Sequence, residues 1–144
     1  MSDEIFFDTN VIAYAFDDNE IKKKQVSGEF LSSVFEKKVS GVLSNQVLFE
    51  LFLVLKNKLK RPVSQIMAEN LVESFIIAEG WKKIDYNYNT IREALHVVDK
   101  HKIPFGDAVI ASTMLENGIK KIYTENENDF KKIPGIVVIN PFRK

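Results

Sequence analysis

Residues 5–12 read Ile-Phe-Phe-Asp-Thr-Asn-Val-Ile, an apolar run that breaks at three polar residues before hydrophobic residues resume. The apolar residues at 5–7 are typical of a short strand that is buried on both faces. Asp8, Thr9 and Asn10 favour turns and helix caps, so we predict that this strand ends at Asp8. The carboxylate of Asp8 is therefore expected at the carboxyl end of a buried strand.

Helical and strand-like patterns alternate along the rest of the chain. Apolar residues recur at helical spacing in five segments, namely residues 21 to about 37, 46 to about 60, 66–76, 91 to about 102 and 105–115. Short apolar runs at 41–44, 81–84, 122–124 and 136–139 predict strands between them. Because parallel neighbours require crossover connections, the alternation predicts an α/β fold in which helices cover both faces of a parallel sheet.

The ends of the predicted helices carry sequence signals. Asn45 is expected to cap the helix that starts at the next residue and stops before Pro62. Gly80 and Gly118 follow predicted helices at positions where a glycine commonly ends one. The stretch 124–130, between the last two strands, is interpreted as a polar loop.

Composition limits the class of protein. The 144 residues are close to the length expected for one domain, so we predict a single domain over residues 1–144. The 20 Lys and Arg residues balance the 20 Asp and Glu residues, which excludes the strongly cationic field of a polybasic nucleic-acid binder. The chain has no cysteine, which excludes thiolate nucleophiles and cysteine zinc sites.

The sequence also predicts a location for the protein. Its start is acidic, unlike the basic start of a signal peptide. The longest uncharged stretch, from Val39 to Phe49, is shorter than the roughly 20 apolar residues that span a bilayer. Together with the absence of cysteine, these features predict a soluble protein with no membrane partner and the cytoplasm as its compartment.

Polar side chains are expected to gather at one edge of the sheet, because ligands of open parallel sheets bind beyond the carboxyl ends of the strands. Asp8 and Thr124 follow predicted strands, and Asp107 lies in the first turn of a helix where the chain returns toward that edge. Glu50 lies within an apolar run, where an unpaired buried carboxylate would be costly. These residues are therefore candidates for a functional site.

Each candidate also has a purely structural interpretation. Asp8 and Asp107 are good helix-capping residues. At about 3.6 residues per turn, Glu50 falls on one stripe of its helix with Gln46, Asn57 and Arg61, which is consistent with a solvated face. Both interpretations stay open at this point.

A cluster of carboxylates at one edge would need a cation. Two carboxylates about 5 Å apart repel by roughly 3 kcal/mol at an effective dielectric constant of about 20. Oxygen ligands favour Mg²⁺ or Mn²⁺. His96 and His101 are five residues apart and cannot share a helix face, and no Walker loop or Gly-x-Ser-x-Gly elbow is present. Metal-assisted phosphoryl transfer or hydrolysis is the chemistry that fits best.

The segments FFDTNVI (6–12) and FGDAVIA (105–111), with Glu50 between them, stand in order along the chain. They are followed by Tyr123-Thr124, Asn126, Asp129-Phe130 and the closing residues 140–142. This ordered set spans nearly the whole chain and resembles the landmarks of the PIN-domain ribonucleases. The resemblance is closest to the stand-alone VapC-type toxins of toxin–antitoxin pairs.

The resemblance implies a three-layer α/β/α sandwich, hydrolysis of RNA phosphodiester bonds by an endoribonuclease, Mg²⁺ or Mn²⁺ as cofactor, frequent homodimers and inhibition by an antitoxin protein. It implies that three acids hold the metal and act in catalysis, namely Asp8, Glu50 and Asp107. Asp129 is a further catalytic candidate, while Asn10, Thr124 and Asn126 would contact the substrate or arrange the shell around the metal. Asn126 stands where many members of the family have an aspartate.

Two other functions are considered. Phosphatases of the haloacid-dehalogenase type also begin with an aspartate at a strand end, but they use a second aspartate two residues later as general acid, and here that position is Asn10. A catalytically inactive RNA-binding or regulatory module with the same fold is the other alternative. The replacement of an acid by Asn126 supports it, because the loss of metal ligands is how such decay would show.

Overall fold

The computed structural model describes residues 3–143, and it places the first apolar run at the centre of a five-stranded sheet. Strand β1 (Glu4–Phe7) pairs with β2 (Ser40–Ser44) on one side and with β4 (Lys121–Tyr123) on the other. The edges are β3 (Trp81–Ile84) beside β2 and β5 (Val137–Ile139) beside β4. All four pairings are parallel, as predicted, in the order β3-β2-β1-β4-β5.

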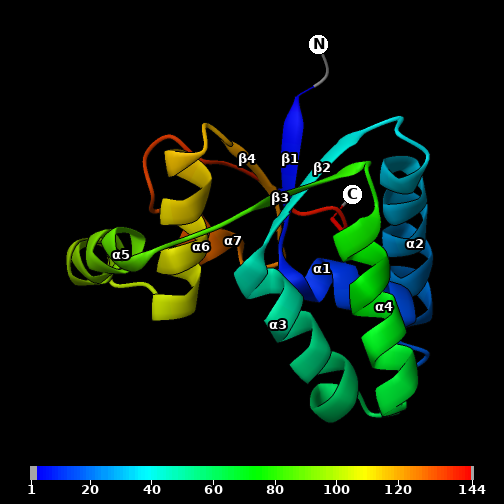
Figure 1. The fold of residues 1–144 in the computed structure, drawn as a ribbon. Helices are drawn as coiled ribbons and strands as arrows, with labels where there is room; N and C mark the ends of the chain where they lie inside the picture. The colour runs from blue at the N-terminus through cyan, green and yellow to red at the C-terminus, as the bar shows by residue number, and fades with distance from the viewer. Residues whose placement is uncertain (1–2, 144) are drawn as a thin grey trace.

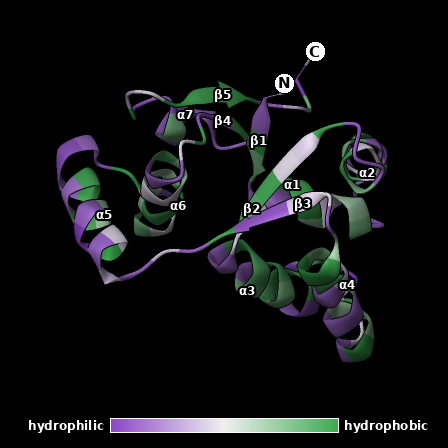
Figure 2. Ribbon diagram, turned by 45° about the horizontal axis from the view of Figure 1, so that its top comes forward, coloured by the Kyte–Doolittle hydropathy of each residue, from purple (hydrophilic) through white to green (hydrophobic). Residues whose placement is uncertain are grey.

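The longer helices lie on both sides of this sheet. Helices α2 (Ile21–Phe35), α3 (Asn45–Leu53) and α4 (Gln65–Ile77) lie on one side, and α5 (Tyr88–His101) and α6 (Phe105–Glu116) lie on the other, as Figures 1 and 2 show. Right-handed crossovers account for this division, because the chain moves outward from β1 to β3 and then returns past β1 to β4. The predicted three-layer α/β/α sandwich is confirmed.

Shorter segments complete the chain. Helix α1 (Thr9–Ala13) and the 3₁₀ turn η1 (Tyr14–Phe16) follow β1 directly. Helix α3 continues into a π-helical segment, η2 (Val54–Lys58). Helix α7 (Glu127–Phe130) lies within the stretch that was interpreted as a polar loop, so that interpretation is wrong for these four residues.

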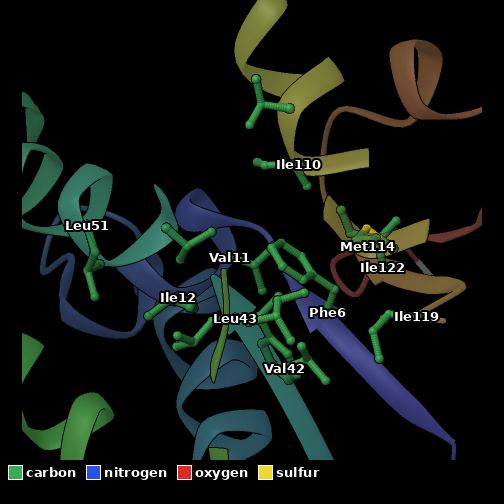
Figure 3. Packing of buried hydrophobic residues seen from close by; sticks show 14 of the residues in the cluster. Phe6, Val11, Ile12, Val42, Leu43, Leu51, Ile110, Met114, Ile119 and Ile122 are labelled. Carbon is green, nitrogen blue, oxygen red and sulfur yellow. The ribbon is translucent and has the colours of Figure 1, made fainter. Parts of the chain in front are cut away.

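The core is built on both faces of β1. Phe6 and Phe7 are both fully buried, and adjacent strand residues point to opposite faces. The Phe7 ring meets the rings of Trp81 and Tyr123 edge to face, with centroids 4.9 and 5.1 Å apart. Figure 3 shows Phe6 in one cluster with Met114 of α6 and other buried residues. Residues buried on both faces explain why this strand reads as a continuous apolar run.

Two of the expected helix ends differ in the structure. Ser44, not Asn45, caps α3, because the Ser44 hydroxyl accepts a hydrogen bond from the Val47 amide at 3.3 Å. Gly80 does not end α4, since the helix stops at Ile77 and Ala78 is already extended. Gly80 is needed for a different reason, because a Cβ atom there would lie 2.5 Å from the carbonyl oxygen of Val34. The expectation for Gly118 is confirmed, since it follows α6 with a φ of +71°.

No helix within residues 3–143 combines the length and the apolar composition needed to cross a bilayer.

Candidate active site

The site begins where β1 and β4 end side by side. This is the point at which the strand order changes direction, and crevices at such points bind ligands in α/β proteins. One oxygen of Asp8, Oδ1, accepts the amide of Thr9 at 2.8 Å and so caps α1. The other, Oδ2, accepts the hydroxyl of Thr124 at 2.7 Å. The capping interpretation is therefore correct for Asp8, and its second oxygen faces the residue that follows β4.

Asp107 enters the site from the first turn of α6. The N-cap of that helix is Pro104, and the Asp107 side chain makes no capping hydrogen bond, so the capping interpretation is wrong here. Instead, Asp107 Oδ2 accepts a hydrogen bond from Nδ2 of Asn126 at 2.6 Å. The backbone N–H of Asn126 in turn donates a hydrogen bond to Thr124 Oγ1 at 3.0 Å. Thr124 and Asn126 thus hold one aspartate each.

Glu50 approaches from α3 in the opposite layer. Its Oε1 accepts Nε2 of Gln46 at 2.6 Å, and its Oε2 accepts the Thr9 hydroxyl at 3.4 Å. Gln46 is buried, with 5% of its surface exposed, and it also donates to the carbonyl of Gly106 at 3.0 Å. The predicted stripe is therefore solvated only in part, because Asn57 and Arg61 are exposed and Glu50 is half-buried, whereas Gln46 is buried.

The carboxylates influence one another electrostatically. Burial raises the pKa of Asp8, against the lowering effect of its hydrogen bonds from Thr124 and Thr9. Burial, followed by the charges of Asp8 and Asp129, raises the pKa of Asp107 to about 7 even though Asn126 donates to it. This cluster of carboxylates therefore carries more negative charge than its surroundings compensate.

The basic side chains of the described residues leave most of this negative charge uncompensated. Within residues 3–143, Asp8, Glu50 and Asp107 form no ion pair with Lys, Arg or His. Asp129 has one such neighbour, Lys132, at 3.9 Å. An all-oxygen donor set with uncompensated negative charge fits a hard divalent cation. Across the described residues, however, no three His, Cys, Asp or Glu side chains are close enough together to form a metal site as they stand.

The remaining acids near the site have other partners. Glu125 points to Lys23 of α2, whose Nζ lies 2.6 Å from Glu125 Oε2, and it accepts the Tyr14 hydroxyl at 2.5 Å. Its charge is thereby committed away from Asp8 and Asp107. Asn10 is exposed, two residues beyond Asp8. Of the predicted site residues, the hydrogen bonds and charge interactions bring together Asp8, Glu50, Asp107, Thr124, Asn126 and Asp129.

A comparison of the sequence with models of protein families identifies its family. The family model described as the PIN domain matches residues 5–136, which include every residue of the site. The chain belongs to the PIN-domain family. Nucleases with a PIN domain generally use divalent metal ions, in agreement with the donor set described above. A comparison with curated proteins found no match.

Several solved structures share the fold of this chain. VapC20 of Mycobacterium tuberculosis, a "Sarcin-Ricin loop cleaving toxin", is 18% identical, with a TM-score of 0.71 over 92% of this chain and 96% of that one. A chain of VapBC2 from Rickettsia felis, bound to a promoter DNA fragment, is 21% identical, with a TM-score of 0.67 over 95% and 98%. A chain of DNA-bound VapBC from Salmonella typhimurium is 18% identical, with a TM-score of 0.67 over 98% and 99%.

Sequence reasoning missed one residue of this PIN-domain site, Gln46. It was noticed only as a member of a polar stripe, because a glutamine four residues before a glutamate is also typical of a solvated helix face. The available signal was its position among apolar residues on both sides, Val47 and Leu48 after it and Val42 and Leu43 before it.

Proposed function

We propose that this PIN-domain protein is an endoribonuclease that uses Mg²⁺ or Mn²⁺ to hydrolyse RNA phosphodiester bonds, and that it is the toxin of a toxin–antitoxin pair. One observation carries the proposal. Asp8, Glu50 and Asp107 come from three different elements to the carboxyl edge of the sheet, and within residues 3–143 no basic side chain pairs with any of them. An arrangement of this kind is unfavourable without a cation and has a direct use with one.

Each residue has a proposed role. Asp8, Glu50 and Asp107 would hold the ion, which supplies charge neutralisation and an activated water when it is bound. Thr124 orients Asp8, and Asn126 orients Asp107 through its Nδ2 atom. Asn126 is therefore proposed to position the metal ligand Asp107 and not to bind the metal itself. Asp129 adds negative charge beside Asp107, and the exposed Asn10 is proposed to contact the substrate.

The first test is cleavage of total cellular RNA with Mn²⁺ or Mg²⁺, with new 5′-phosphate ends mapped by sequencing. The wild type and an Asp99→Asn control are expected to give the same cuts, because Asp99 is 91% exposed on α5, away from the site. A chelator and the Asp8→Asn substitution should each abolish the cuts. Metal-dependent cleavage that survives in purified Asp8→Asn protein would rule out the assignment of Asp8.

An antitoxin partner is proposed because matched structures come from VapBC complexes. An apolar groove of about 580 Å³ lies between α3 and α4, and its lining includes Phe49, Phe52, Leu53, Glu69 and Glu73. Phe49 is 51% exposed, and the two glutamates give the rim a negative charge. We propose this groove as the docking surface for an antitoxin helix with an apolar face flanked by basic residues.

Cells that express the chain with the protein encoded by an adjacent gene test this partnership. The chain alone should inhibit growth, and co-expression should restore growth when the adjacent gene encodes the antitoxin. With the Phe49→Asp chain, co-expression should no longer restore growth. The homodimer implied by the resemblance stays a prediction, which light scattering of the purified chain checks.

One alternative has an observation in its favour. Asn126 donates a hydrogen bond at the position where many family members have an acid, as an inactive RNA-binding module would allow. Such a module would bind RNA equally well with and without a chelator and would show no Mn²⁺ binding. A phosphatase of the aspartate-nucleophile type lacks its general acid, because Asn10 occupies that position.

A further inference from the structure

Gln46 links the two helical layers at the candidate site. Its Nε2 donates to Oε1 of Glu50 on α3 at 2.6 Å and to the carbonyl of Gly106 at the start of α6 at 3.0 Å. Among residues 3–143, no other hydrogen bond joins α3 to α6. Gly106 immediately precedes Asp107, so a single amide group connects two of the three acids proposed to hold the metal.

The burial of Gln46 is costly to the fold. Its Oε1 atom is buried and has no hydrogen-bond partner within residues 3–143, and a buried acceptor without a partner lowers the stability of a protein. A methionine of similar length would fill the same space without that penalty. Stability alone therefore does not account for a glutamine here, whereas the two bonds of its Nε2 atom serve the arrangement of the acids.

A second glutamine–glutamate pair shows that the spacing alone does not explain the contact. Gln65 and Glu69 on α4 have the same four-residue separation, and Gln65 Nε2 donates to Glu69 Oε1 at 3.1 Å. Both residues are exposed, and within the described chain Gln65 Nε2 has no acceptor on another element. Only Gln46 is buried and joins its glutamate to the opposite layer.

We propose that Gln46 is a positioning residue that holds Glu50 in a fixed place relative to Asp107, so that the two carboxylates can share one divalent cation. The inference rests on the proposed nuclease function and deepens it by adding a residue outside the acidic set. Groups that orient metal ligands typically change metal affinity or activity by about 10-fold to 100-fold when they are removed.

The test compares Gln46→Met with Gln65→Met in the full chain. Mn²⁺ affinity is measured without RNA by titration calorimetry, and kcat and KM are then measured on a cleaved RNA. Gln46→Met should lower Mn²⁺ affinity or kcat by about 10-fold or more with little change in KM. Its melting temperature in chelator should stay close to that of the wild type, because removal of the partnerless oxygen offsets the loss of the two hydrogen bonds that Nε2 donates. Gln65→Met should match the wild type in all four measurements.

Wild-type Mn²⁺ affinity and kcat in folded Gln46→Met protein would overturn the inference. If that variant does not fold, Gln46→Leu takes its place, because it also removes the amide donor and adds no charge; unchanged affinity and kcat there would also overturn it. A wild type that neither binds Mn²⁺ nor cleaves RNA would instead remove the proposed function, and this inference with it. If the wild type binds Mn²⁺ and cleaves RNA and the Gln46 variant does so equally well, only this inference is wrong and the proposed function is supported.

Discussion

Asp107 carries a proton more readily in the folded chain than in the unfolded one. Its ordinary pKa is 3.8, and burial together with the charges of Asp8 and Asp129 raises the pKa to about 7. A carboxyl whose pKa is raised on folding stabilises the folded state fully below its unfolded pKa. That contribution is lost as the pH rises through the folded pKa. In metal-free protein, Asp107 therefore favours folding at about pH 4 and no longer does so above about pH 7.

Substitution Asp107→Asn should remove this pH dependence. In the presence of a chelator, the variant is expected to melt at a higher temperature than the wild type, by a margin that grows between about pH 4 and about pH 7 and then levels off. Thermal unfolding at a series of pH values measures the margin, with Asp99→Asn as the exposed control. A margin that is constant across this range would contradict the assigned pKa.

Much of the site could be predicted residue by residue. Asp8 and Thr124 were found because they follow strands, and Asp107 because it opens a helix at the same edge. The resemblance implied that Asn126 contacts the substrate or arranges the shell around the metal, but the directions in which Asn126 and Glu125 point out of one short turn could not be predicted. Asn126 faces Asp107, whereas Glu125 faces Lys23, and sequence spacing carries no information on that choice.

At the level of elements, the contact between β3 and α2 can be tested through a pair of glycines. Gly80 lies against the carbonyl oxygen of Val34, which a Cβ atom would approach to 2.5 Å, while Gly28 on α2 has nothing within 4 Å of its added Cβ. Gly80→Ala should lower the free energy of unfolding by about 1–3 kcal/mol. Gly28→Ala should raise it by about 0.5–1 kcal/mol, because alanine suits a helix interior better.

Urea denaturation measures both glycine variants. The opposite signs are the important result, since both substitutions add the same methyl group. Two variants of equal stability would show that α2 and the turn before β3 can move apart without loss.

A second prediction concerns the contact between α2 and the turn after β4. Lys23 pairs with Glu125 at 2.6 Å, and its Nζ also lies 4.7 Å from the centroid of the Tyr14 ring. With about a third of each charged side chain exposed, Lys23→Met should lower the free energy of unfolding by about 1 kcal/mol.

The control for Lys23→Met is a substitution in an ion pair on the solvent-exposed surface of the protein. Lys37 and Glu79 lie 3.2 Å apart with 64% and 85% of their side chains exposed, so Lys37→Met should change stability by less than about 0.5 kcal/mol. Both variants are compared by urea denaturation. A loss in Lys23→Met no larger than in the control would mean that the partly buried pair does not hold the turn in place.

The predictability of the elements followed their length. Helices of twelve or more residues with an apolar stripe, such as α2 and α5, were expected within a few residues of their observed ends. Helices α1 and α7 have five and four residues, too few for a repeating pattern to show. Helix α4 ends within one residue of the predicted range 66–76, but Gly80 was wrongly expected to stop it, because a glycine serves both as a helix stop and as a place of close approach, and only the packed structure distinguishes the two.

At the level of the whole molecule, a bound cation should stabilise the fold. Binding to the folded state alone adds about 2.7 kcal/mol when the free ion is at about 100 times its dissociation constant. Mn²⁺ should therefore raise the melting temperature of the wild type and of Asp99→Asn, but not that of Asp8→Asn. Differential scanning fluorimetry with a Mn²⁺ series measures the shift. Equal shifts in all three proteins would place the bound ion outside the carboxylate site.

The strand order has a consequence for how the protein is made. Strand β1 pairs with β4, and Thr124, which holds Asp8, lies 116 residues later in the chain. During translation, the edge of β1 that pairs with β4 thus stays unpaired until most of the chain has left the ribosome. Until then, Asp8, Asp107 and Asn126 cannot meet, so a nascent chain has no complete site. An enzyme with this topology would gain the ability to cut RNA only near the end of its own synthesis.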